Sequence, residues 1–157
     1  MKILVMSDMH GRSENFEKAI ENEPDAKNII FLGDGIKKAE ELSYIYGDKN
    51  FYMVAGNCDG LFGFEPAVKI ITISGFKILI THGHTFGVKT SLTSLKERAA
   101  LEKADIALYG HTHKADITVE NGIYLMNPGT LAGYNGLYSY LVIEISDNNI
   151  YPKIVKL

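Results

Sequence analysis

The chain has little cysteine, little arginine and no long hydrophobic run. Its 157 residues include one cysteine, Cys58, which excludes an intrachain disulfide and a zinc site built from several thiolates. Two arginines, Arg12 and Arg98, and a formal net charge of −3 argue against a dedicated nucleic-acid-binding protein, which needs a basic surface stripe. No apolar stretch approaches the length of a membrane span, and the first one is too short for a signal peptide. We therefore expect a cytoplasmic protein with neither a nucleic-acid nor a membrane partner.

The remaining composition is that of a folded globular protein, with 46% hydrophobic and 22% charged residues. We expect one domain over residues 1–157. In the first half, strand-like apolar runs alternate with helical spacing, which predicts a parallel sheet core. The predicted strands there are 3–6, 28–32 and 51–55, and the predicted helices are 13–23 and 36–46.

The second half is richer in strands, and its turn signals predict hairpins. The predicted strands are 68–73, 76–81, 105–109, 115–119, 123–126, 138–145 and 150–155, with one helix over 91–103. On that helix Leu92, Leu95, Ala99 and Ala100 form the expected apolar side. We therefore predict an α/β fold in which two sheets pack face to face with helices outside.

All five histidines fall in three short clusters that follow strand-like runs. Carboxylate and amide side chains follow the other runs, and ligands bind at the carboxyl ends of strands in α/β sheets. The predicted metal ligands are Asp8, His10, Asp34, Asn57, His82, His111 and His113. They are sufficient for two divalent ions, with Asp34 as the expected bridge. Nitrogen and oxygen ligation without several thiolates suits Mn²⁺ first, with Fe, Zn²⁺, Ni²⁺ or Co²⁺ as alternatives.

The charge of such a site predicts its substrate. Two divalent ions exceed the charge of Asp8, Asp34 and a bridging hydroxide by about one unit. An anionic phosphate ester is the natural guest, because the metals would hold its oxygens and supply an in-line nucleophile. We therefore predict a phosphodiesterase that acts on a small phosphate ester by in-line attack of a metal-bridging hydroxide.

Five motifs in this order resemble those of the calcineurin-like metallophosphoesterase superfamily. They are Asp8-x-His10, Gly33-Asp34, Gly56-Asn57-Cys58-Asp59, His82-Gly83-His84 and Gly110-His111-Thr112-His113. The Gly-Asn-Cys-Asp variant, the small size and Asn127-Pro128-Gly129-Thr130 are similar to the compact bacterial and archaeal phosphodiesterase branch.

The resemblance spans Asp8 to Thr130 and implies a four-layer α-β-β-α sandwich with two mixed β-sheets. It places one metal on Asp8, His10, Asp34 and His113, and the other on Asp34, Asn57, His82 and His111. Relatives of this size are often homo-oligomers, but no surface stripe in this sequence indicates one, so the oligomeric state stays open.

The predicted catalytic residues are Asp34, Asn57, Cys58 and His84. Many relatives have histidine where this chain has Cys58, and an ordinary thiol, with a pKa of about 8.5, is a poorer proton donor to an alkoxide. We therefore expect a preference for esters with good leaving groups. His84 either contacts the phosphate or lines the groove without touching metal.

Several assignments stay open at this point. Asp59 either orients a ligand or lies in a solvated turn, Arg12 either holds phosphate or is solvated, and Thr130 either makes a hydroxyl contact or belongs to a turn. The loops 59–65 and 85–90, with Phe62, Phe64 and Phe86, are expected to shape the groove. The alternative functions are a non-catalytic protein-binding scaffold of the same fold, a phosphomonoesterase and a nuclease, and the acidic net charge disfavours the nuclease.

Overall fold

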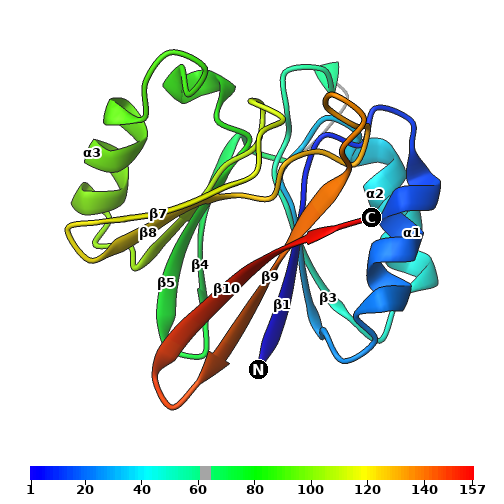
Figure 1. The fold of residues 1–157 in the computed structure, drawn as a ribbon, viewed down its shortest axis with the longest axis horizontal. Coiled ribbons are helices and arrows are strands. Elements are labelled where there is room, and N and C mark those ends of the chain that lie inside the picture. Colours follow the sequence, from blue (N-terminus) through cyan, green and yellow to red (C-terminus); the bar gives the residue numbers. More distant parts are fainter. Residues whose placement is uncertain (61–64) are drawn as a thin grey trace.

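The strands of this chain assemble into two sheets that lie against each other (Figure 1). The computed structural model describes residues 1–60 and 65–157, and within them it contains two five-stranded sheets and three α-helices. The first sheet has the order β10-β9-β1-β2-β3, and the second has the order β4-β5-β6-β8-β7.

The strands of the first sheet are β1 (Lys2–Met6), β2 (Asn28–Phe31), β3 (Asn50–Met53), β9 (Ser139–Ser146) and β10 (Asn149–Lys156). Those of the second are β4 (Val68–Ile73), β5 (Phe76–Thr81), β6 (Ile106–Leu108), β7 (Asp116–Glu120) and β8 (Ile123–Asn127). The helices are α1 (Ser13–Asn22), α2 (Ile36–Ile45), α3 (Thr93–Leu101) and the short 3-10 turn η2 (His84–Phe86).

Both sheets are mixed, and each has a parallel centre. Strands β1, β2 and β3 pair in parallel, while β9 and β10 continue the sheet in antiparallel pairs. In the second sheet β5, β6 and β8 are parallel, with β4 and β7 antiparallel at the two edges. The parallel centres bring the carboxyl ends of their strands to a common end of each sheet, which positions the site.

Three apolar layers show how the elements stack. Leu4 and Met6 of β1 pack against α1 and α2, whereas Ile3 and Val5 on its other face pack against the second sheet. Leu79 of β5 lies in the third layer, which α3 covers. Because successive residues of a strand point to opposite faces, β1 is apolar throughout and buried on both sides. The fold is therefore the predicted α-β-β-α sandwich.

Some local predictions need correction. The third helix begins at Thr93 rather than residue 91, because the Ser91 hydroxyl accepts the Thr93 backbone N–H at 3.1 Å in the turn before it. Ala100 is exposed and does not belong to the buried face formed by Leu95 and Ala99. Phe86 is half-buried and packs against the layer beneath α3.

Two further expectations concern the groove loop and a membrane span. Phe62 and Phe64, expected in the groove, lie outside the described residues. Across residues 1–60 and 65–157, no helix is long and apolar enough to cross a membrane.

Candidate metal centre

The structure brings the predicted ligands of both sheets together at one end of the sandwich. Asp8, Asp34 and Asn57 follow β1, β2 and β3, while His82 follows β5 and His111 follows β6. Five of the predicted ligands have left-handed backbone conformations, which cost non-glycine residues about 1–3 kcal/mol each. They are Asp8 (φ 56°), His10 (φ 40°), Asp34 (φ 60°), His111 (φ 66°) and His113 (φ 61°). Such strain concentrated at one place is typical of a functional site.

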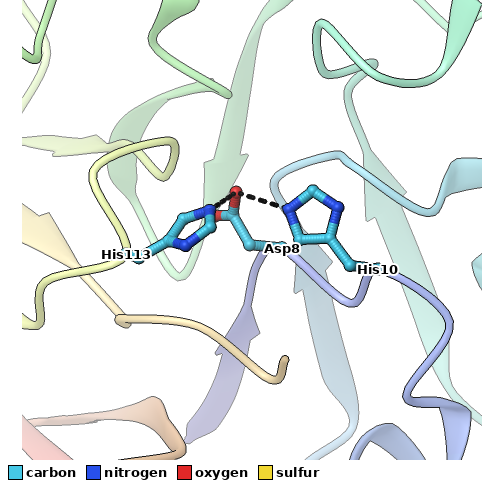
Figure 2. Close-up of side chains that lie close together, drawn as sticks. All are labelled: Asp8, His10 and His113. Carbon is cyan, nitrogen blue, oxygen red and sulfur yellow. Dashed lines mark ion pairs between the residues drawn. The ribbon is translucent and has the colours of Figure 1, made fainter. Parts of the chain in front are cut away.

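Asp8 has one satisfied and one unsatisfied carboxylate oxygen. Its Oδ2 accepts hydrogen bonds from the Ser7 hydroxyl at 2.5 Å and from the His111 backbone N–H at 3.1 Å. Its Oδ1 is buried without a hydrogen-bond partner and lies 3.0 Å from His113 Nε2 and 3.8 Å from His10 Nε2 (Figure 2). A buried anionic oxygen left without a hydrogen bond is costly unless a cation neutralises it. This side of the site therefore fits a metal ion.

Asp34 lies between the histidines of the two sheets. Its Oδ1 accepts the Cys58 backbone N–H at 2.8 Å, and its Oδ2 lies 3.4 Å from His82 Nε2 and 3.6 Å from His10 Nε2. Burial alone would raise the pKa of Asp34, but hydrogen bonds from His82 and from the Cys58 N–H outweigh it and hold the pKa well below its usual range. Asp34 is therefore an ionised, buried carboxylate.

His82 is fully buried, and its ring is oriented by the first sheet. Its Nδ1 lies 2.7 Å from the Leu32 carbonyl oxygen, so Nδ1 carries the proton and donates it. Its Nε2 points to Asn57 Oδ1 at 3.1 Å and to Asp34 Oδ2. Burial would lower the pKa of His82, but the hydrogen bond to Asp34 and the charge of Asp8 raise it. Since three acceptor atoms converge here, either a proton or a metal cation must lie among them.

His84 and His111 lie next to His82, with ring centroids 5.4 Å and 5.0 Å from it. Burial and the charge of His82 lower the pKa of His84, and its buried Nδ1 has no hydrogen-bond partner. Burial, His82 and Lys89 together lower the pKa of His111. Low pKa values keep both imidazoles neutral, which is the form that binds metals.

Asn57 and Cys58 lie on the exposed side of the site. The Asn57 amide donates to Cys58 Sγ at 3.3 Å. Burial and the nearby Asp34 raise the pKa of the Cys58 thiol, so it stays protonated at neutral pH.

Among the described residues, three sets of side chains place one ligand atom each within 4.8 Å of one another. The sets are Asp8 with His10 and His113, His10 with Asp34 and Cys58, and Asp8 with Asp34 and His82. The two carboxylates each belong to two sets, so they lie between neighbouring positions at which a cation could sit. His84 and His111 belong to none of these sets, and Asn57 Oδ1 lies beside His82 Nε2.

Asp59 holds two of the ligand loops in place, a role that the sequence left open. Its carboxylate accepts backbone N–H groups of Asp34 at 2.8 Å, Gly35 at 2.7 Å, Ile36 at 2.8 Å and Gly56 at 2.7 Å. Two of these donors, on Gly35 and Ile36, lie at the start of α2, where N–H groups lack intrahelical partners. Asp59 therefore ties the loop after β2 to the loop after β3.

The structure also shows the contacts of Thr130 and Arg12, whose roles the sequence left open. The Thr130 hydroxyl donates to the Asp8 carbonyl at 2.9 Å, and the buried Asn127 amide donates to the Gly110 carbonyl at 3.0 Å. Both therefore support the backbone of ligand loops. The Arg12 side chain is 56% exposed and lies 3.7 Å from Glu14, so it is a solvated surface residue.

Residues 1–148 match the model of the calcineurin-like phosphoesterase superfamily domain. The chain belongs to the calcineurin-like phosphoesterase superfamily. At the level of this superfamily it is a metal-dependent phosphoester hydrolase.

Three similar proteins align with most of this chain. A probable metallophosphoesterase of Bacillus subtilis is 32% identical over 132 residues, covering 83% of this chain and 75% of that protein. A phosphodiesterase of Methanocaldococcus jannaschii is 29% identical over 149 residues, covering 85% and 86%. The crystal structure of a predicted phosphoesterase from Streptococcus pneumoniae superposes with a TM-score of 0.84 at 28% identity, covering 99% of this chain and 88% of that one.

Two glycines let the ligand loops of this phosphoesterase pack closely against the residues around Asp8 and Asp34. A Cβ on Gly56 would clash with the carboxylate and backbone nitrogen of Asp34. A Cβ on Gly110 would clash with the Ser7 hydroxyl beside Asp8. These two motif glycines therefore allow backbone from separate strands to pack directly against the buried carboxylates.

Proposed function

We propose that this protein is a two-metal phosphodiesterase that hydrolyses small phosphate diesters. One divalent ion would be held by Asp8, His10, Asp34 and His113, and the other by Asp34, Asn57, His82 and His111, with Mn²⁺ as the first choice. When bound, the ions would neutralise the phosphate charge and provide the water-derived nucleophile for in-line displacement. The name of the Methanocaldococcus relative supports the choice of a diester.

The protein's own groups prepare this chemistry. The Leu32 carbonyl fixes the ring of His82, and Cys58 N–H fixes one oxygen of Asp34, so each presents its remaining atom to the site. In this proposal His84, whose ring lies beside those of His82 and His111, contacts the phosphate of the substrate. The protonated Cys58 thiol supplies only weak assistance to the leaving group, which favours esters with acidic leaving groups.

A single observation carries the proposal. The buried Asp8 Oδ1 has no hydrogen bond, yet imidazole nitrogens of His113, His10 and His82 lie within 3.0 Å, 3.8 Å and 3.9 Å of it. A buried carboxylate oxygen without a hydrogen bond is costly, and a cation held between it and the surrounding imidazoles would remove that cost. The site is therefore arranged for cations.

The test removes all metal from the protein and then adds back Mn²⁺, Zn²⁺, Ni²⁺ or Mg²⁺ singly. We expect metal-dependent hydrolysis of bis-p-nitrophenyl phosphate that exceeds hydrolysis of p-nitrophenyl phosphate. Faster cleavage of the monoester would replace the diesterase with a monoesterase. Failure to bind metal at all would favour a protein-binding scaffold.

A further inference from the structure

A cavity of about 600 Å³ is lined by residues of the loops that also carry predicted metal ligands. Val88 and Lys89 line it from the segment that follows His84. Thr112, which separates His111 from His113, and Lys114, which follows them, line a second side. These loops lie at the same end of the sandwich (Figure 1).

Tyr134 forms a third wall, on a segment that is fixed to Asp8. The Leu131 N–H donates to the Ser7 carbonyl and the Ala132 N–H to the Asp8 carbonyl, each at 3.1 Å. Tyr134 and Leu137 then exchange two backbone hydrogen bonds, which close the loop that carries the Tyr134 ring. The Tyr134 wall is therefore tied to Asp8, and the Thr112 wall lies between two predicted ligands, so both have fixed positions relative to the candidate metal centre.

The charges of the cavity are predominantly positive. Lys89 and Lys114 are both exposed, and neither takes part in the ion pairs formed by the described residues. The Lys114 ammonium lies 5.8 Å from the centroid of the Tyr134 ring, over the cavity wall.

One carboxylate, Asp116, also lines the cavity. It accepts hydrogen bonds from the Tyr109 hydroxyl at 3.4 Å and from the Thr118 hydroxyl at 3.0 Å. Asp116 keeps its negative charge, so two lysines against one carboxylate leave the lining with a net charge of +1. Two ammonium groups beside a metal centre attract negative charge.

We propose that this cavity binds the non-reacting arm of the phosphate ester, and that Lys89 and Lys114 select an arm that carries its own negative charge. This inference rests on the proposed function, because it names the substrate class for the same site. The substrate would then be a diester with a second anionic group, a carboxylate or a further phosphate, on the arm that is retained.

The test uses a matched series of p-nitrophenyl alkyl phosphates with the metal-loaded protein. The arms have equal length and end in a carboxylate, a hydroxyl or a trimethylammonium group, while the leaving group stays the same. We expect kcat/KM to fall in that order. In Lys89→Gln and Lys114→Gln, the ratio of carboxylate to hydroxyl rates should fall by about threefold to fivefold each, as for partly solvated ion pairs. Raised salt should reduce the same ratio.

Lys153→Gln is the matched control. Lys153 is exposed on β10 and lies outside the cavity lining, so its loss changes the net charge equally without touching the pocket. Its carboxylate-to-hydroxyl ratio should equal that of the parent. Equal rates for all three arms, a preference for the ammonium arm, or lysine variants that keep the parent ratio would each overturn the cavity assignment and leave the phosphodiesterase intact.

Isothermal titration calorimetry with the metal-free protein separates the two proposals. Tighter binding of the carboxylate ester than of the hydroxyl ester, lost in Lys89→Gln/Lys114→Gln, supports the cavity assignment independently of turnover. If that binding preference is present but the metal-loaded protein cleaves none of the esters, the proposed function fails and the pocket stands.

Discussion

The two sheets contribute different chemistry to the candidate metal centre. The first sheet supplies the oxygen ligands and one imidazole, that of His10, with Asp8 and Asp34 almost completely buried and tied to backbone N–H groups. The second sheet supplies imidazoles, of which only His82 is fully buried. The anionic half of the site, formed by the two carboxylates, is therefore buried and held by hydrogen bonds, whereas most of the imidazoles are partly exposed to solvent. Metal binding should depend chiefly on the first sheet, and substrate selection on the second.

The strongest test of this division is Asp34→Asn. The amide keeps the shape of the side chain but removes the charge that two ions would share, so activity should fall by at least about 10³-fold. Phosphodiester hydrolysis at saturating Mn²⁺ measures the effect. Asp48→Asn is the control, because Asp48 is exposed and pairs only with Lys27 at the surface. Near-parental turnover of Asp34→Asn would remove Asp34 from its bridging position.

Gly56→Ala tests whether the anionic half is as tightly packed as the structure indicates. The new methyl group would collide with the Asp34 carboxylate and backbone, so the free energy of unfolding should fall by about 1–3 kcal/mol. Gly47→Ala is a matched control, since a Cβ there lies 3.6 Å from the Tyr44 carbonyl oxygen, an ordinary contact. Denaturant unfolding of the metal-free proteins compares them, and equal stability of the two variants would contradict the close approach.

Asp59→Asn tests how strongly the ligand loops depend on their hydrogen bonds to Asp59. An amide offers one acceptor oxygen instead of two, so part of the four hydrogen bonds is lost and an N–H donor faces backbone N–H groups. Losing charged hydrogen bonds should cost about 1–3 kcal/mol, seen as weaker Mn²⁺ binding and a lower kcat with little change in KM. Asp25→Asn, at an exposed position, should leave both unchanged. A variant that changes neither metal affinity nor kcat would show that Asp59 has no such role.

Cys58→His tests whether the exposed residue after β3 of the first sheet takes part in protonating the leaving group. An imidazole there would donate a proton to the leaving group more readily than the thiol with its raised pKa. We expect the rate for esters with poor leaving groups to rise by as much as about tenfold. A fully positioned general acid supplies a larger gain, of about 10²-fold. Rates for aryl esters of graded leaving-group pKa measure it. A rate and substrate preference equal to those of the parent would exclude a role for residue 58 in protonation.

The sequence predicted that the candidate ligands of both halves would meet, because they follow strand-like runs at positions where parallel strands end together. The supporting contacts were harder to predict. Asp59 and Thr130 are ordinary turn residues in sequence, and only their backbone partners distinguish them: Asp59 meets the start of α2, and Thr130 meets Asp8 across 122 positions of the chain. The cavity was unpredictable for the same reason, since Lys89, Lys114 and Tyr134 come from three separate loops. Local patterns locate strand ends, but packing between distant loops decides what lies beside them.

Metal stoichiometry tests the central claim most directly. Native mass spectrometry of the metal-free protein titrated with Mn²⁺ should show two ions bound per chain, and at most one in Asp34→Asn. Saturation of the parent protein at a single ion, or two ions retained in Asp34→Asn, would contradict a paired site built on that carboxylate.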